Sequence, residues 1–302
     1  MNLIHPLLRT IKFLADYILF CNWFIALAAA ALVFETQLIA TGNIYIDATL
    51  GVVFFSTLVI YNMHKLIAVF TNLNRQIGFR HTFIKNNFGL FLATGLASVT
   101  GLLISLIFCE IRTLLLFIPA ALIAVAYSLP LIRSKYSGLK LREVPGMKIV
   151  FIGIVWVYVT VIVPVAANQL YLPLNSLLFI VMRRMLFISA IAITFDIRDL
   201  KIDKGEGIST LPVLWGEKKS KIFAMSLMGI FLCLLYFQFR VFDLGLHPHF
   251  ELTIPLPTAA IITMILIYFS GEGRDEYYYS FLLDGMMILQ FVSVWIYFRM
   301  FA

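Results

Sequence analysis

Residues 190–216 read AIAITFDIRDLKIDKGEGISTLPVLWG, and within this stretch a long apolar segment gives way to charge. Three of its acids, Asp196, Asp199 and Asp203, follow a D-x-x-D-x-x-x-D pattern. At roughly 100° per residue, positions i, i+3 and i+7 lie within about 60° of one another on a helix surface, so the carboxylates converge. Mg²⁺ takes carboxylate oxygens and is often shared with substrate phosphates. The pattern therefore predicts a Mg²⁺ site that handles a diphosphate at a membrane surface.

The composition is that of an integral membrane protein. Of the 302 residues, 62% are hydrophobic and only 13% are charged. Because a spanning helix needs about 20 mostly apolar residues, we expect about nine spans in an all-α bundle. They are predicted near residues 13–34, 46–70, 88–109, 112–132, 148–167, 175–195, 222–242, 252–270 and 278–300. No Pro, Gly or Ser-rich linker divides the chain, which predicts a single membrane domain over residues 1–302.

The basic residues indicate the orientation of the chain. Most of the 23 Lys and Arg fall in the N-terminal segment and in every second connection, including residues 71–87, 133–147 and 196–221. Cytoplasmic segments of membrane proteins carry this excess, so the N-terminus and the acidic motif are predicted to be cytoplasmic, at the cell membrane if the protein is prokaryotic. The same rule explains the net charge of +7, and it removes the reason to expect a nucleic-acid partner.

Two blocks of this sequence resemble the UbiA superfamily of intramembrane prenyltransferases. The stretch from Asp196 to Gly216 is similar to the family's second aspartate-rich motif, D-x-R-D-x-x-x-D followed by G-x-x-T-L-P-V and a Gly. The second block begins with YSLPL at residues 127–131 and continues through residues 141–156, and it is similar to the family's segment between the fourth and fifth helices.

The resemblance implies transfer of an isoprenoid group from its allylic diphosphate to a hydrophobic acceptor, commonly an aromatic ring. It implies Mg²⁺ at Asp196, Asp199 and Asp203, and it makes a cap of cytoplasmic loops the place of reaction. Metal and basic side chains would stabilise the leaving charge, while the apolar bundle would shield an allylic cation from water. The expected diphosphate contacts are Tyr127, Arg133, Lys135 and Arg198.

The chain departs from the family pattern in its second predicted span. There the family has N-D-x-x-D-x-x-x-D, whereas residues 61–70 read YNMHKLIAVF. Asn62 matches the Asn, but the three Asp positions fall on Met63, Leu66 and Phe70. Three hypotheses follow: a single Mg²⁺, a basic residue in place of the missing metal, or a catalytically degenerate protein that binds or presents an isoprenoid lipid.

Lys65 is the candidate for that basic residue. It is an ionisable residue inside an apolar segment, one position before Leu66 and on the same helix face as Asn62. We therefore predict catalytic roles for Asn62 and Lys65, with the ammonium contacting the diphosphate as a point charge. The alternative is that Lys65 extends its ammonium to the membrane interface. Arg183 and Arg184 lie too far from Asp196 along their helix to share the metal, and are expected to pair with a carboxylate or to reach outward.

Overall fold

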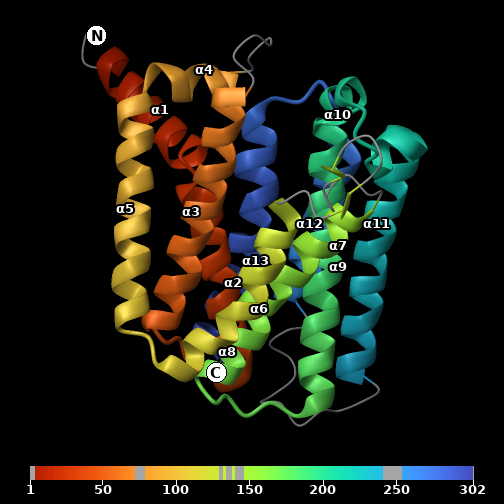
Figure 1. The fold of residues 1–302 in the computed structure, drawn as a ribbon. Coiled ribbons are helices and arrows are strands. Elements are labelled where there is room, and N and C mark those ends of the chain that lie inside the picture. Colours follow the sequence, from red (N-terminus) through yellow and green to blue (C-terminus); the bar gives the residue numbers. More distant parts are fainter. Residues whose placement is uncertain are drawn as a thin grey trace. The chain divides into compact units, whose positions relative to one another are not determined.

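The computed structural model describes residues 4–71, 79–128, 132–133, 138–139, 146–240 and 254–301. In these residues seven helices are long and apolar enough to cross a membrane, and they lie within residues 23–41, 48–67, 88–107, 147–167, 174–198, 211–238 and 278–300. Two further apolar helices, at 111–124 and 255–269, are shorter. The all-helical membrane fold is therefore confirmed (Figure 1), while a total of nine spans stays a prediction.

The chain divides into two compact units, each taken here over its described residues. The first comprises Met1–Ala30 and Ile46–Cys109, and the second comprises Ala31–Tyr45 and Glu110–Ala302. The boundary falls inside one helix, α2 (Trp23–Thr41), whose two halves belong to different units. The prediction of a single domain over residues 1–302 is not tested by this division.

The first unit is built from helices, of which α4 is the shortest. Its elements are α1 (Ile4–Phe20), the first half of α2, α3 (Ala48–Thr71), α4 (Phe79–Asn86) and α5 (Phe88–Ile107). Helix α3 packs along α5, and α4 contacts both α1 and α5.

The first predicted span, 13–34, is wrong because the chain breaks inside it. Asn22 adopts a left-handed backbone with φ of 67°, a conformation that Asn tolerates better than most residues. Helix α1 therefore ends at Phe20 and α2 begins at Trp23. Helix α2 is among the seven helices that are long and apolar enough to cross a membrane, and α1 is not. Asn22 is the single polar residue in the apolar run 18–34, and one polar side chain in such a run does not by itself predict a break.

Two side chains of α3 hold the break between α1 and α2. The side-chain amide of Asn22 donates to Asn62 Oδ1 at 2.7 Å, and both residues are buried. Lys65 Nζ donates to the carbonyl of Phe20, the last residue of α1, at 2.6 Å. A lysine in this position donates a hydrogen bond to a terminal carbonyl, and its positive charge interacts favourably with the negative end of the helix dipole. Leu66 packs against the apolar cluster of Cys21, Ile84 and Phe91.

The second unit surrounds the long helix α9. Its elements are the second half of α2, α6 (Ile111–Ser128), β1 (Ile132–Arg133), β2 (Gly138–Leu139), α7 (Met147–Val157), the π-helix η2 (Tyr158–Ile162), α8 (Val163–Ala167), α9 (Leu174–Arg198), α10 (Leu200–Glu206), α11 (Leu211–Arg240), α12 (Pro255–Phe269), the π-helix η4 (Tyr278–Leu283) and α13 (Asp284–Phe301). Helix α9 packs along α11 and α7. The two-residue strands pair antiparallel, with Arg133 opposite Gly138.

A buried polar network joins α2, η2 and α9 inside this unit. Arg184 pairs with Glu35 at 3.3 Å and donates to the Leu32 carbonyl and the Thr160 hydroxyl. Pro164 has no N–H for the carbonyl of Thr160, four residues earlier, and the Thr36 hydroxyl donates to that carbonyl at 2.8 Å instead. Pairing with a carboxylate, one of the two expectations for Arg183 and Arg184, is thus confirmed for Arg184.

The Glu35–Arg184 pair generates a stability prediction. Glu35→Gln leaves the buried guanidinium of Arg184 uncompensated, so we expect the variant to lose on the order of 3–5 kcal/mol of unfolding free energy. Thermal unfolding in detergent measures this loss. Glu110→Gln, at an exposed position, is the control and should be nearly neutral. Equal midpoints for the two variants would show that the pair contributes nothing.

Lys65 generates a second prediction. Lys65→Met removes the hydrogen bond to the last carbonyl of α1, so the variant should be destabilised by about 1.5–3 kcal/mol, the range for hydrogen bonds to charged groups. The measurement is again the unfolding midpoint, now without any substrate. A residue whose sole task is to contact a diphosphate would leave that midpoint unchanged.

Candidate functional site

The acidic motif lies at the junction of α9 and α10. Helix α9 ends at Arg198, Asp199 caps both helices, and α10 ends at Gly207, which has the left-handed φ of 71° that favours glycine. The expectation of one uninterrupted helix through all three acids is therefore corrected. The winding still continues across the joint, because the Asp199 N–H donates to the Phe195 carbonyl and the Asp203 N–H to the Asp199 carbonyl. The carboxylates consequently remain near one another.

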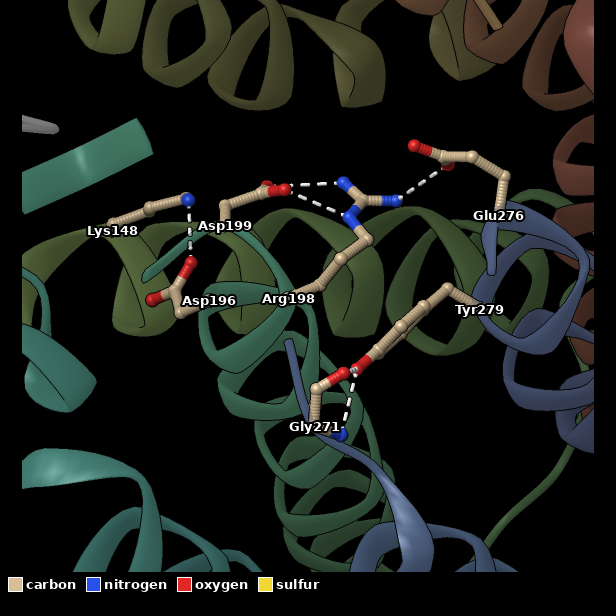
Figure 2. Close-up of polar contacts among 7 residues, drawn as sticks. All are labelled: Lys148, Asp196, Arg198, Asp199, Gly271, Glu276 and Tyr279. Atoms are coloured by element: carbon tan, nitrogen blue, oxygen red, sulfur yellow. Dashed lines mark hydrogen bonds and ion pairs between the residues drawn. The ribbon is translucent and has the colours of Figure 1, made fainter. Parts of the chain in front are cut away.

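Asp196 is the most deeply buried of the three acids, with 1% of its surface exposed. Its Oδ1 accepts a hydrogen bond from Lys148 Nζ at 2.5 Å, as Figure 2 shows. Lys148 is the second residue of α7, whose N-cap is Gly146, and α7 packs against α9. Asp196 Oδ2 is buried and has no hydrogen-bond partner among the described residues. One carboxylate oxygen is thus neutralised by an ammonium, and the other remains to be satisfied.

Asp203 has a similar oxygen. Its side chain is buried, and its Oδ2 lacks a hydrogen-bond partner within the described part of the chain. Burial is the main cause that raises the pKa of the Asp203 carboxyl, to about 6; Lys148 lowers it, and Asp196 and Asp199 raise it further. The nearby hydroxyl of Thr210 lowers the pKa of Asp203. This hydroxyl is buried, and it forms no hydrogen bond of good geometry within the described residues. Within the described residues, repulsion from Asp196 and Asp199 thus disfavours the charged form of Asp203.

Asp199 differs from the other two acids because a guanidinium holds it. Arg198 Nε and Nη2 donate to its two oxygens at 2.8 and 3.0 Å, and Arg198 Nη1 lies 3.4 Å from Glu276 Oε2. The guanidinium also lies over the rings of Phe195 and Tyr279, at 4.9 and 5.5 Å from their centroids. Arg198, expected to contact the diphosphate, therefore has protein partners on several sides (Figure 2).

The residues present fit a hard divalent cation. Mg²⁺ is usually bound by one or two carboxylates, several waters and substrate phosphate oxygens. Asp196 Oδ2 and Asp203 Oδ2 are buried oxygens that need such a partner. Asp199 is the third carboxylate of the motif, and Arg198 donates to both of its oxygens. No group of three or more His, Cys, Asp or Glu side chains in the described residues is already arranged as a metal site, so the assignment of all three acids as ligands stays a prediction.

The remaining predicted site residues either belong to the first unit or lie outside the described side chains. Asn62 and Lys65 belong to the first unit and contact Asn22 and Phe20 there. Tyr127 lies near the end of α6 and Arg133 in β1, but the structure describes their backbone alone, and Lys135 lies outside the described residues. These assignments stay predictions.

Sequence reasoning missed Lys148 and Glu276 as members of the cluster. Lys148 stands in the second block of resemblance, within residues 141–156, for which the sequence predicts no site role at this position. Glu276 lies in the polar segment 270–277, between the last two apolar segments. A buried acid in a membrane helix needs a counterion, and this requirement is the signal that could have directed attention to both segments.

Solved structures with the same fold are known. A UbiA homolog from Archaeoglobus fulgidus bound to GPP and Mg²⁺ aligns with a TM-score of 0.65 at 12% identity, covering 94% of this chain and 99% of that chain. The same homolog bound to DMAPP and Mg²⁺ gives 0.63 at 13% identity, with the same coverage. A digeranylgeranylglyceryl phosphate synthase structure gives 0.52 at 18% identity, covering 94% of this chain and 98% of that one. These likenesses show the fold.

The family itself is shown by the sequence. A search among curated proteins found no match. The model of the UbiA prenyltransferase family, however, matches residues 84–295, which is more than half of the chain and includes both blocks of resemblance together with the Lys148–Asp196 pair. The chain therefore belongs to the UbiA prenyltransferase family.

Proposed function

We propose that this protein transfers an isoprenoid group from an allylic diphosphate to a hydrophobic acceptor, with Mg²⁺ at the acidic motif. The observation that carries the proposal is the pair of buried carboxylate oxygens, on Asp196 and Asp203, that lack partners in the described residues. Family membership supports the reaction class, and the solved homolog was bound to GPP or DMAPP with Mg²⁺. The acceptor class remains aromatic or lipid.

In the proposed reaction, the bond between the isoprenoid C1 and the diphosphate oxygen breaks, and C1 forms a bond to the acceptor, which loses a proton. Bound Mg²⁺ would stabilise the charge on the departing diphosphate. Lys148 would keep Asp196 ionised, and its own positive charge would also stabilise the departing diphosphate. The apolar spans would exclude water from the allylic cation. Arg133 and Lys135 stay proposed diphosphate contacts, on cytoplasmic loops in the topology that we propose.

A second function is favoured by one specific observation in the first unit. No carboxylate stands at the positions of the first aspartate-rich motif: Leu66 packs in an apolar cluster, and Lys65 caps α1. These contacts favour a descendant that binds or presents an isoprenoid lipid without turnover. Both functions use the same acidic motif, and they differ in whether pyrophosphate is released.

Pyrophosphate release by the full-length protein in liposomes separates the two functions. We expect release from an allylic diphosphate that requires Mg²⁺ and falls by about 10²-fold or more in Asp203→Asn, because a charge that faces the leaving group is lost. Glu206→Gln, an exposed acid on the same short helix, is the matched control and should retain activity. Unaltered release from Asp203→Asn would remove the metal assignment. Absence of release with every diphosphate tested would support lipid binding instead.

Lys148 provides a test that needs no turnover. Lys148→Met leaves the buried Asp196 without its ammonium, so Mg²⁺ becomes the available cation and should stabilise the variant more than the wild type. Binding to the native state raises stability with ligand concentration, and the Mg²⁺-induced shift of the unfolding midpoint measures this. Lys204→Met, at an exposed lysine of α10, should shift as the wild type does. The same Mg²⁺ shift in Lys148→Met and Lys204→Met would contradict the role given to Lys148.

A further inference from the structure

The connection between α12 and η4 is rich in acidic residues, and hydrogen bonds join its beginning to η4. It contains Glu272, Asp275 and Glu276. Tyr279, which is fully buried, accepts a hydrogen bond from the Gly271 N–H at 3.0 Å and donates to the Gly271 carbonyl at 2.8 Å. These two bonds join the beginning of the connection to η4 and fix the segment between them (Figure 2). The connection is thus held at its base by a buried aromatic side chain.

Two ion pairs attach this connection to the acidic motif. Glu276 lies 3.4 Å from Arg198, whose side chain is largely buried, and Glu272 lies 2.8 Å from Lys201, whose side chain is 81% exposed. An exposed pair contributes little, whereas a shielded pair that belongs to a larger network contributes more. The Arg198–Glu276 contact is therefore the stronger link between the two segments.

Arg198 contacts both this connection and Asp199, so the position of the connection affects the orientation of the Asp199 carboxylate. The guanidinium is planar and rigid, and its bidentate bond fixes the plane of the Asp199 carboxylate. Glu276 holds the guanidinium from the other side, and the rings of Phe195 and Tyr279 support it. The bidentate bond from Arg198 therefore restrains the rotamer of the short, partly exposed Asp199 side chain.

We propose that Glu276 and Tyr279 are positioning residues for the prenyl-transfer site: they hold Arg198, and through it they hold the Asp199 carboxylate toward the cation that the acidic motif shares with the substrate diphosphate. The proposal rests on the proposed function of this site. In this proposal Arg198 orients the Asp199 carboxylate, whereas the sequence predicts that Arg198 contacts the diphosphate. Outer partners of metal ligands act in this manner, and their loss typically weakens metal affinity by about 10- to 100-fold.

The test measures Mn²⁺ affinity by electron paramagnetic resonance, using the full-length protein in detergent with a non-hydrolysable allylic thiodiphosphate. Glu276→Gln should weaken Mn²⁺ binding about 10-fold. Glu272→Gln removes the same charge from the same segment, so it controls for through-space electrostatics and should change the affinity by less than twofold. Tyr279→Phe should weaken Mn²⁺ binding in the same direction as Glu276→Gln. Thermal unfolding of each variant confirms that it is folded.

Arg198→Lys provides the second arm. Lysine keeps the positive charge but loses the bidentate bond, so this variant should weaken Mn²⁺ binding, and adding Glu276→Gln to it should weaken binding no further, because coupled residues are not additive. Equal Mn²⁺ affinity in the wild type and Glu276→Gln, or additive losses in the double variant, overturns the positioning role while leaving the proposed function intact. Wild-type protein that binds no Mn²⁺ even with the thiodiphosphate overturns both.

Discussion

The ion pair between Lys148 and Asp196 is the contact on which the rest of the site depends. A carboxylate buried at the end of a membrane-spanning helix is costly unless a cation neutralises it. Helix α7 delivers that cation to α9, because Lys148 stands at the start of α7 and the two helices pack together. The other two acids need other partners. Asp199 forms an ion pair with Arg198, whereas the buried Oδ2 of Asp203 has no hydrogen-bond partner in the described residues. The proposed Mg²⁺ would provide that partner.

The first unit shows what replaces the missing aspartate-rich motif. At and beside the acid positions of the family pattern, this chain has side chains that hold its own helices: Asn62 bonds Asn22, Lys65 caps α1, and Leu66 packs against apolar neighbours. These contacts account for the residue types of that stretch without a metal. Two cationic side chains pair with acids of the second motif: Arg198 with its neighbour Asp199, and Lys148, from another helix, with Asp196. The hypothesis of a basic residue in place of a metal is therefore better supported for Lys148 than for Lys65.

The sequence was informative where a pattern has one physical cause. Long apolar runs must form helices in a bilayer, and so the long membrane helices and the end of α9 at the acidic motif could be predicted. The break at Cys21 and Asn22 could not, because apolar residues continue across it and the cause is one left-handed residue held by α3. Lys148 and Glu276 were missed for a related reason: their partners lie 48 and 78 residues away in the chain, and single-sequence patterns do not encode such pairings.

The central claim is that the acids at the end of α9 bind an allylic diphosphate through Mg²⁺, whether or not turnover follows. Calorimetric titration of the purified protein with geranyl thiodiphosphate, in Mg²⁺ and then in EDTA, tests it most directly, with Asp196→Asn and Asp203→Asn as variants. The account predicts binding that requires Mg²⁺ and is lost in both variants. Binding of equal strength in EDTA, or in the two variants, would contradict it.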